Sequence, residues 1–515
     1  MPKALLSVHD KTGLVPFARA LRELGWTLIA SGGTAKLLRE NDILVIDVAD
    51  YTGSPEILGG RVKTLHPAIH GGLLARPTDS DRADLSRISA EFIDLAAVNL
   101  YPFEQTIAKP NVTLDEAIEN IDIGGVALIR AAAKNHDRVT LVCDPADYDA
   151  VLAEIKGGGV TPETRRRLAV KGFASTAHYD TAIAAYLAPP LPPPSLTGGD
   201  MTLTLFPIQT LRYGENPHQS AALYSFERGA GPLGGKILQG KELSYNNLLD
   251  LDAAWKGAVS FARPTICIVK HLSPCGIASA DELARAYRAA FECDKVSAFG
   301  GVIASNCPFD GATAETLGDL FVECIAAPGF TAEAKTILAA KKNCRLIEMP
   351  NTDIEPRYEL RSITRGVLRQ DVDFGDPPLS STEGDTGGGW RIVSRRPPTE
   401  SEWIDLRFAW KACQHVKSNA IVFAKGEATV GIGGGQPNRV DCVRLAAERA
   451  GEKARGAVMA SDAFFPFPDS VELAARSGIT TVVHPGGSLR DADSLAVADA
   501  ANMAMVVTGV RHFRH

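Results

Sequence analysis

Lys270 and His271 are adjacent residues that together supply a cation and a titratable base. They follow the run TICIV, residues 265–269, whose apolar and β-branched residues predict a buried strand. Ligands of α/β sheets bind where strands end, so both side chains stand where a substrate would lie. Histidine exchanges protons near neutral pH and lysine stabilises an oxyanion, which suits attack of a nucleophile on a carbonyl. A lysine and a histidine after a strand are also common in ordinary chain, so this pair alone does not define a site.

A second candidate is the turn SerGlyGlyThr at residues 31–34, which follows one strand-like run and precedes a helical one. Backbone N–H groups at such a turn form an anion cradle, and glycines let a phosphate approach the chain closely. Lys11 and Thr12 follow the first strand-like run, where a cation and a hydroxyl would complete a phosphate site. Taken alone, a turn of this kind is more often a plain connection.

Other patterns argue against metal and dinucleotide sites. His66 and His70 have helical spacing, but Pro67 interrupts the helix that a metal pair needs, so we expect structural roles for both. The nine cysteines are scattered without a CxxC pair, which makes a disulfide framework or a structural zinc site unexpected. The segment GIGGGQ, residues 431–436, lacks the GxGxxG spacing of a dinucleotide loop.

The elements that must position these residues alternate between strand and helix. The first strand, helix and strand are predicted at residues 4–8, 14–24 and 27–30, which is a βαβ unit. Further along, the pattern predicts strands at 95–99 and 139–144 and helices at 114–118 and 125–134. We therefore expect a parallel α/β domain over about residues 1–150, with a helical extension to residue 187.

Residues 188–200 hold five prolines and a glycine pair, which cannot continue a helix or a central strand. We predict that they link the first domain, 1–187, to a second domain at 201–515. A second interruption at residues 376–390 lies between segments that each alternate strands and helices. The second domain is therefore expected to consist of two similar lobes.

The composition indicates a multi-domain globular protein without a broad nucleic-acid surface. The chain has 515 residues, 45% of them hydrophobic, and a net charge of -7. No stretch approaches the ~20 apolar residues of a membrane span, and the N-terminus has no targeting pattern. We expect a cytoplasmic protein that binds neither membrane nor nucleic acid.

Sixteen peptides, in one collinear order, resemble a known family. Those of the first domain are SVHDKTGL, ASGGTAKLL, GGRVKTLHPAIHGGLLAR, NLYPFEQT, IENIDIGGVALIRAAAKNH and VTLVCDPADY. Those after residue 200 are LRYGENPHQ, LSYNNLLDLDAAW, IVKHLSPCGIA, VSAFGGVIA, CIAAPGF, HVKSNAIVFAK, GIGGGQPNRVD, SDAFFPFPDSV, HPGGSLRD and TGVRHFRH. Together they resemble the bifunctional purine enzymes that combine an AICAR transformylase with an IMP cyclohydrolase.

The resemblance implies an α/β fold with a methylglyoxal-synthase-like N-terminal domain and a transformylase domain of two cytidine-deaminase-like lobes. It implies formyl transfer from 10-formyltetrahydrofolate to aminoimidazole carboxamide ribonucleotide (AICAR), giving FAICAR, which is then closed to inosine monophosphate (IMP). The formylfolate is a cosubstrate, no cofactor is tightly bound, and an alkali cation such as potassium accompanies the family. A homodimer is implied as well.

Six catalytic side chains are carried over with the resemblance. For ring closure, Lys63, Tyr101 and Lys134 would stabilise negative charge, and Asp122 would orient or accept the amide proton. The plainer alternative is that the two lysines are solvated and that Asp122 caps a helix. For formyl transfer, His271 would act as general base and Lys270 would stabilise the tetrahedral intermediate.

The resemblance also implies residues that bind the nucleotide or the folate, although an ordinary structural role is an alternative for each of them. These residues are Lys11, Thr12, Ser31, Gly32, Gly33, Thr34, Arg61, Thr64, Arg212, Tyr213, His218, Asn247, Phe299, Asn419, Asp462, Phe464 and Arg511.

Two alternative functions fit the residues less well. A zinc deaminase needs HxE and PCxxC, whereas this chain has HisLeuSer at 271–273 and a single cysteine in ProCysGlyIleAla at 274–278. A catalytically inactive nucleotide sensor would not need the intact set of catalytic side chains. One departure from many bacterial relatives, Leu272 and Ser273 after the Lys270–His271 pair, is expected to alter packing and leave the chemistry intact.

Overall fold

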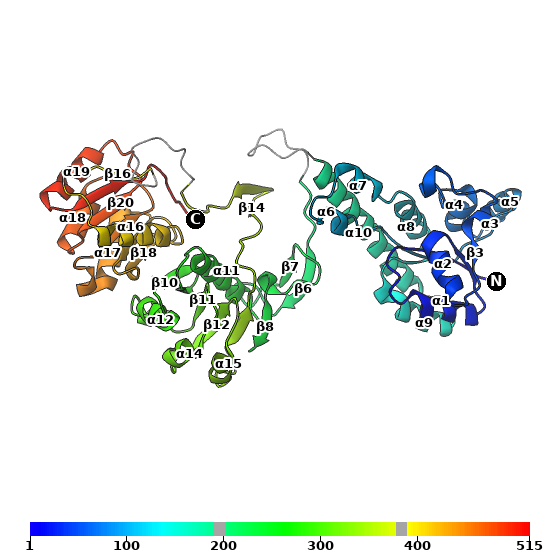
Figure 1. Ribbon diagram of the computed structural model, residues 1–515, viewed down its shortest axis with the longest axis horizontal. Helices are drawn as coiled ribbons and strands as arrows, with labels where there is room; N and C mark the ends of the chain where they lie inside the picture. Colours follow the sequence, from blue (N-terminus) through cyan, green and yellow to red (C-terminus); the bar gives the residue numbers. More distant parts are fainter. Residues whose placement is uncertain (189–200, 377–388) are drawn as a thin grey trace. The chain divides into compact units, whose positions relative to one another are not determined.

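The computed structural model describes residues 1–188, 201–376 and 389–515. Within them the chain forms two compact units, Met1–Thr204 and Leu205–His515 (Figure 1). Residues 189–200 and 377–388, which hold most of the predicted linker and of the predicted lobe boundary, lie outside the described residues.

Unit 1 is built on a parallel sheet of five strands in the order β3-β2-β1-β4-β5. The strands are β1 (Lys3–Val8), β2 (Thr27–Ala30), β3 (Ile46–Asp47), β4 (Leu95–Asn99) and β5 (Thr140–Val142). The chain leaves β1 toward β2 on one side, whereas β4 lies on the other side of β1. The carboxyl ends of β1 and β4 therefore flank a topological switch point, where open α/β sheets bind ligands.

Helices cover both faces of this sheet, and buried clusters fill the space on each face. α1 begins after Gly13, whose φ is 68°, and buries Leu14, Phe17 and Leu21 at helical spacing. The helices of unit 1 are α1 (Leu14–Glu23), α2 (Gly32–Glu40), α3 (Val48–Thr52), η1 (Leu58–Gly60), α4 (Pro67–Leu74), α5 (Asp79–Arg87), α6 (Phe103–Ile107), α7 (Leu114–Glu119), α8 (Gly124–Lys134), η2 (Pro145–Asp147), α9 (Tyr148–Lys156) and α10 (Pro162–Leu187).

Unit 2 contains two six-stranded sheets with the same connectivity. The first has the order β10-β9-β11-β12-β13-β8 and the second, read in the same direction, β18-β17-β19-β20-β21-β16. In both, the successive pairings are antiparallel, antiparallel, parallel, parallel and antiparallel. The strands are β8 (Lys236–Gln239), β9 (Thr265–Lys270), β10 (Ser273–Ser279), β11 (Gly301–Ser305), β12 (Val322–Ala327), β13 (Arg345–Glu348), β16 (Arg391–Ile392), β17 (Ala420–Ala424), β18 (Thr429–Gly434), β19 (Val458–Ser461), β20 (Thr481–His484) and β21 (Ala504–Val507). The expected pair of similar lobes is therefore present.

One buried cluster joins the two lobes. It takes Leu251 and Trp255 from α11 (Tyr245–Val259) and Leu406 and Trp410 from α16 (Glu400–Cys413), together with side chains of both sheets. The other helices of unit 2 are η3 (Pro232–Gly234), α12 (Leu283–Phe291), α13 (Lys295–Ala298), α14 (Gly311–Leu317), α15 (Ala332–Leu338), α17 (Arg439–Ala450), η4 (Gly451–Ala454), α18 (Asp469–Arg476) and α19 (Asp491–Ala500). Two hairpins complete the unit, β6 (Phe206–Leu211) with β7 (Ala221–Ser225) and β14 (Tyr358–Ile363) with β15 (Gly366–Asp371).

The lobes repeat even a close helix–strand approach. A Cβ on Gly276 of β10 would lie 1.9 Å from the carbonyl oxygen of Ala290 in α12, and a Cβ on Gly431 of β18 would lie 2.1 Å from that of Ala446 in α17. Glycine is required at both positions because any side chain would collide with the helix backbone. Among the described helices, none is both long and apolar enough to cross a membrane.

Candidate active sites

Two lysine ammonium groups converge on the N-terminus of α2. The Cβ that Gly32 lacks would lie 3.3 Å from Lys63 Nζ, and the one that Gly33 lacks would lie 3.7 Å from Lys11 Nζ. The first N–H groups of a helix have no partner inside the helix, and the helix dipole adds positive potential there. This end of unit 1 is therefore built to hold an anion such as a phosphate.

The two threonines expected at this anion site have hydroxyls of different availability. Thr34 Oγ1 accepts from the N–H of Val8 (3.2 Å) and donates to its carbonyl oxygen (3.1 Å), so the hydroxyl ties α2 to β1. Thr34 can offer an anion only its backbone N–H. Thr12 donates its own N–H to Asp10 Oδ1 at 2.9 Å, and its side chain is exposed beside Lys11.

The segment after η1 runs between the α2 N-terminus, where Lys63 lies, and the start of α8, where Thr64 lies. Lys63 Nζ lies 3.6 Å from Glu56 Oε2, and Arg61 forms an ion pair with Glu119. The Thr64 hydroxyl lies 3.0 Å from the position that a Cβ on Gly124 would take, so Thr64 packs against the first turn of α8.

Tyr101 follows the carboxyl end of β4, which flanks the switch point, and its backbone N–H interacts with the carboxylate of Asp122. Asp122 Oδ1 accepts from the N–H of Gly125 at 2.7 Å, which caps α8, as the plainer reading of the sequence anticipated. Burial raises the pKa of Asp122, while the N–H groups of Gly125 and Tyr101 and the nearby His9 partly oppose that rise. A carboxyl group with a raised pKa is a stronger base once ionised than an ordinary aspartate. Tyr101 is 41% exposed.

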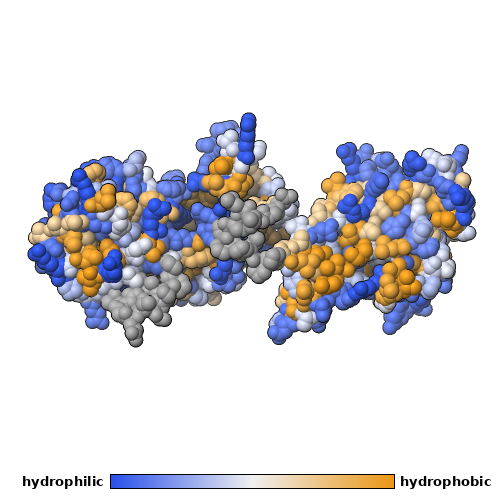
Figure 2. Space-filling view, turned by 90° about the horizontal axis from the view of Figure 1, so that it is seen from above, coloured by the Kyte–Doolittle hydropathy of each residue, from blue (hydrophilic) through white to orange (hydrophobic). Residues whose placement is uncertain are grey.

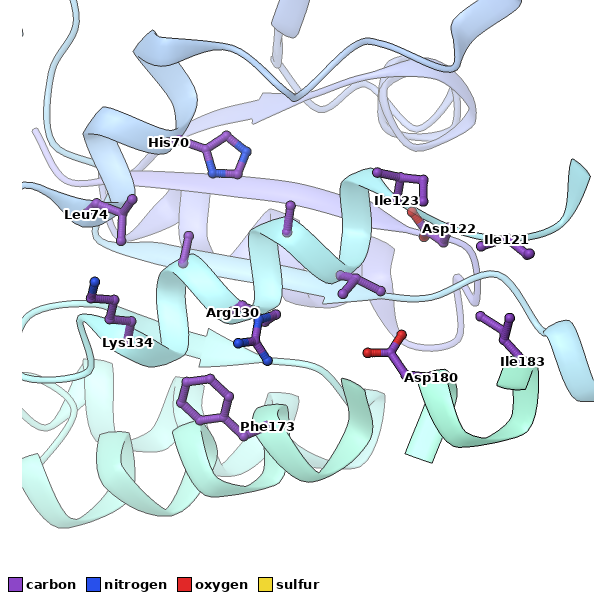
Figure 3. A pocket seen from close by; sticks show the side chains of 13 residues that line it. His70, Leu74, Ile121, Asp122, Ile123, Arg130, Lys134, Phe173, Asp180 and Ile183 are labelled. Carbon is purple, nitrogen blue, oxygen red and sulfur yellow. The ribbon is translucent and has the colours of Figure 1, made fainter. Parts of the chain in front are cut away.

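Lys134 occupies the opposite end of α8 from Asp122. Both line a hollow of about 580 Å³ beside α8 and α10 (Figure 3). At 1.5 Å per residue, the length of α8 separates them by about 15 Å. Within one chain the structure therefore brings Lys11, Lys63, Tyr101 and Asp122 around the switch point but leaves Lys134 apart.

Three residues of unit 1 that the sequence analysis did not single out position this site. Asn99 Oδ1 accepts from the N–H groups of His9 (2.6 Å) and Asp10 (2.9 Å), which shapes the loop after β1. The His9 ring meets the Tyr101 ring edge-on, with centroids 5.5 Å apart. The Tyr179 hydroxyl accepts from the N–H of Asp122 at 2.8 Å and donates to the carbonyl oxygen of Asn120. His9 and Asn99 belong to quoted peptides, whereas Tyr179 stands in α10 without any local signal.

In unit 2, Lys270 and His271 lie where the β9–β10 hairpin turns. Lys270 is the last residue of β9 and pairs with Ser273, so His271 and Leu272 form a two-residue turn. Lys270 Nζ donates to the carbonyl oxygen of Phe299 at 2.7 Å. The His271 ring is exposed and forms no hydrogen bond to another described residue. The pair is therefore presented at a strand end, as its position in the sequence predicts.

Asn419 and Asp462 belong to a buried polar network in the second lobe. Arg439 donates to Asn419 Oδ1 at 2.6 Å and forms an ion pair with Asp462. Ser418 Oγ donates to Asp462 Oδ2 at 2.5 Å, and Asp462 is 0% exposed. In this conformation Asp462 supports Asn419 through Arg439 and does not itself face solvent.

The edge strands of the two lobes bring this network toward the hairpin turn. Ala278 of β10 bridges Ala428 in antiparallel fashion, and Thr429 Oγ1 bonds both backbone polar groups of Ile277. Because the strands run in opposite directions from there, the His271 end of β10 and the Gly434 end of β18 point the same way. Asn419 donates to the carbonyl oxygen of Gln436, just beyond β18.

The other residues expected in the transformylase site fall into exposed positions or caps. Phe299 is 57% exposed and packs on Phe321 with ring centroids 5.5 Å apart, and Phe464 is half-exposed. Asn247 accepts from the N–H of Ser244 at 3.2 Å in the capping box of α11. The remaining four lie in loops or at the C-terminus: Arg212 stacks over Tyr213, His218 is exposed, and Arg511 stacks over Phe513. Among the described residues of this set, Phe299 bonds the Lys270 side chain through its carbonyl oxygen, and none is hydrogen-bonded to the His271 side chain.

The described residues contain no group of three or more His, Cys, Asp and Glu side chains arranged to hold a metal ion. His66 caps α4, its Nδ1 accepting from the N–H of Ala68 at 3.1 Å, while His70 lies within that helix. This geometry gives His66 the structural role that we expected for it.

Comparison with known proteins covers the whole chain. The family model described as AICARFT/IMPCHase bienzyme matches residues 132–449, and the model of the MGS-like domain matches residues 13–127. A protein of Sorangium cellulosum named bifunctional purine biosynthesis protein PurH is 51% identical over 100% of this chain and 99% of its own. Proteins with the same name from Cyanothece sp. and Bacillus subtilis are 51% and 49% identical, over 100% of this chain in both cases and 100% and 99% of their own.

Proposed function

The chain belongs to the AICARFT/IMPCHase bienzyme family, and we propose that its two reactions take place at two separate sites, one in each unit. The protein transfers a formyl group from 10-formyltetrahydrofolate to AICAR and closes the product, FAICAR, to IMP in purine biosynthesis. A catalytically inactive nucleotide sensor is not favoured, since identity to bifunctional enzymes extends over the full length of the chain.

We assign ring closure to the switch point of unit 1. The observation that carries this assignment is the convergence of Lys11 and Lys63 on the α2 N-terminus, together with the buried carboxyl of Asp122, which interacts with His9 and with the N–H of Tyr101. The nucleotide phosphate would bind at the helix N-terminus. The carboxamide nitrogen then attacks the formyl carbon, Asp122 takes the proton that the nitrogen loses, and Lys63 and Tyr101 stabilise the alkoxide before water leaves. Lys134 remains a candidate through the family resemblance alone.

We assign formyl transfer to the β9–β10 turn of unit 2. The amine of AICAR attacks the formyl carbon, His271 takes the amine proton, and the ammonium group of Lys270 stabilises the tetrahedral oxyanion. The bond between the formyl carbon and the folate nitrogen then breaks, and a proton goes to that nitrogen. The exposed His271 ring and the strand-end position of Lys270 support these roles. Asn419 and Phe299 would contact the substrates.

Two alanine variants test the separation of the sites. His271→Ala is expected to abolish formyl transfer and leave closure of supplied FAICAR at its native rate. Lys63→Ala is expected to do the reverse, so that FAICAR accumulates when AICAR and 10-formyltetrahydrofolate are supplied. Comparable loss of both activities in either folded variant would contradict a two-site enzyme, and native-rate closure by Lys63→Ala would remove Lys63 from the site.

We also propose a homodimer. Large apolar side chains are exposed on α7, on α10 and just before α8, among them Leu114, Phe173 and Ile123, and Figure 2 shows hydrophobic residues gathered in a broad patch on the N-terminal unit. Soluble monomers rarely expose such patches, and a second copy of the chain is the occupant that the family resemblance implies. Light scattering on purified protein measures the mass that decides this.

The family resemblance further implies a cytoplasmic location, potassium as an accompanying cation and no tightly bound cofactor. The nine cysteines are free thiols, which suits a reducing compartment. Replacing potassium chloride by tetramethylammonium chloride at equal ionic strength, with the transfer rate as the readout, tests the dependence on potassium.

A further inference from the structure

The turn that presents His271 has an unusual backbone. The φ angles of His271 and Leu272 are 55° and 60°, so both residues occupy the left-handed region. A two-residue hairpin turn with positive φ at both positions normally holds glycine, asparagine or aspartate, because a Cβ makes this conformation costly. Here both positions carry large side chains.

The carboxylate of Asp250, on α11, binds this turn. Its Oδ2 accepts from the N–H of His271 at 3.1 Å, and its Oδ1 accepts from the N–H of Leu272 at 2.6 Å. Both carboxylate oxygens are thus engaged with the two consecutive N–H groups whose residues carry the strain. The side chain of Asp250 has no place in the two sites described above.

The second lobe repeats this arrangement without a histidine. Gly426 and Glu427 form the turn between β17 and β18, with φ angles of 62° and 53°. Asp405 of α16 accepts from their N–H groups, at 3.0 Å from Gly426 and 2.8 Å from Glu427. The lysine before the turn is repeated as well, because Lys425 Nζ donates to the carbonyl oxygen of Arg455 at 2.9 Å, as Lys270 Nζ does to that of Phe299.

The two turns differ in the residue at their first position, which shows whether folding alone requires a histidine there. In the second lobe the first turn position is glycine, which adopts positive φ without penalty. In the first lobe that position is His271, and the conformation depends more heavily on the aspartate. The fold thus tolerates glycine at this corner, and the strained histidine needs a reason beyond folding.

We propose that Asp250 is a positioning residue for formyl transfer, holding the Lys270–His271 turn in the one backbone conformation that directs the imidazole at the amine of AICAR. This inference rests on the proposed role of His271. With the turn fixed by Asp250 and Lys270 tied to the carbonyl oxygen of Phe299, base and cation keep a constant separation. Loosening the turn moves the base from its line of attack, which lowers the turnover rate more than it weakens nucleotide binding.

The test compares Asp250→Asn with Asp405→Asn, in the full-length chain. Each variant keeps one acceptor oxygen and turns an amide toward a backbone N–H, so the two disturb equivalent turns. We expect Asp250→Asn to lower kcat of formyl transfer about 10- to 100-fold, with KM for AICAR within about threefold of the native value. Asp405→Asn is expected to stay within about twofold in both constants, and both variants should close FAICAR at the native rate.

A double variant separates backbone conformation from general damage. Adding Leu272→Gly to Asp250→Asn lets one turn position adopt positive φ freely, so part of the lost kcat should return, about threefold or more. Equal loss in the Asp250 and Asp405 variants, a loss confined to KM, or no recovery with glycine would overturn the proposal. His271→Ala is assayed alongside: if it keeps native transfer, the assignment of His271 as base fails, whereas its inactivity combined with a native-like Asp250→Asn sinks the positioning role alone.

Discussion

Asp122 combines a helix cap with a buried carboxyl group, and the two roles place different demands on the side chain. The cap needs only an acceptor oxygen for the N–H of Gly125, which asparagine supplies about as well as aspartate. Proton abstraction needs a carboxylate that ionises. Replacing Asp122 by asparagine therefore removes the base and leaves the start of α8 intact.

Asp122→Asn is predicted to lower FAICAR closure by about 10²- to 10⁴-fold, the usual contribution of a general base. Because burial raises the pKa of Asp122, the native rate should fall at low pH around a value above the ordinary 3.8, and the variant should lose this limb of the pH profile. Because the pKa of Asp122 is higher in the folded protein than in the unfolded chain, its ionisation at neutral pH lowers the free energy of unfolding. The melting temperature of the variant should therefore be unchanged or higher. A variant that closes FAICAR at the native rate would show that Asp122 is only a cap.

At the level of single residues, the sequence indicated the groups that stand at strand ends and could not indicate those that act from a distance. Lys11, Lys63 and His271 lie within peptides that resemble the family, and their residue types are typical of a binding or catalytic site. Tyr179 lies 57 residues after Asp122, and Asp250, although it belongs to a quoted peptide, lies 21 residues before His271, so only the fold brings them to these partners. The sequence also could not predict that Asp462 is buried in an ion pair with Arg439, because this depends on how β17, β19 and α17 pack together.

Among the elements, those with strong periodicity were predicted closely. The predicted strands at 27–30 and 95–99 match β2 and β4, and the predicted helix at 125–134 matches α8 to within one residue. The short elements α3, η1 and α6 were missed, since three to five residues carry too little periodicity to detect. The repeat of the two lobes is expressed in strand pairing and in turns, where Lys270 corresponds to Lys425 but His271 to Gly426, so residue identity reveals little of it.

A buried histidine in the C-terminal segment, His512, makes a pH-dependent contribution to the stability of the protein. His512 is 3% exposed, and its Nδ1 and Nε2 lie 2.7 Å from Asp373 and 3.0 Å from Asp376. Hydrogen bonds to these carboxylates overcome the effect of burial and raise the pKa of His512 to about 9, from 6.5. Asp376 also accepts from the indole N–H of Trp410, so the cluster ties the C-terminal segment to α16.

Because the folded pKa of His512 exceeds the unfolded one, its contribution is fully present below about pH 6.5 and is lost as pH rises through about 9. His512→Gln is predicted to destabilise the protein by about 1–2 kcal/mol at pH 6.5, allowing for solvent around Asp373, and by progressively less toward pH 9. Urea unfolding at several pH values measures this difference, and His515→Gln, at an exposed position of the same tail, serves as the control. A constant difference between native and variant protein across this range would be inconsistent with a charged His512.

At the scale of the whole molecule, the buried clusters respect the two units. Those of unit 1 contain only residues up to Tyr186, and those of unit 2 begin at Leu211. Each unit therefore has its own core, and each is long enough to fold alone. The alternation of strands and helices and the proline-rich run suggested this division, but the sequence carried no measure of how tightly the two lobes of unit 2 share one core.

Expressing residues 1–188 and 201–515 as separate proteins is predicted to give two folded pieces with one activity each. Every residue that we assign to ring closure lies at or before Lys134, and Tyr179, which supports Asp122, also lies in the first piece. The first piece should therefore close FAICAR at a near-native rate, measured by the appearance of IMP. The second piece keeps the β9–β10 turn, Asp250 and the Asn419 network, and should transfer formyl groups provided that it still dimerises. If residues 1–188 fold by circular dichroism yet cannot close FAICAR, the closure site must include groups from unit 2, and the division of the two reactions between the units is wrong.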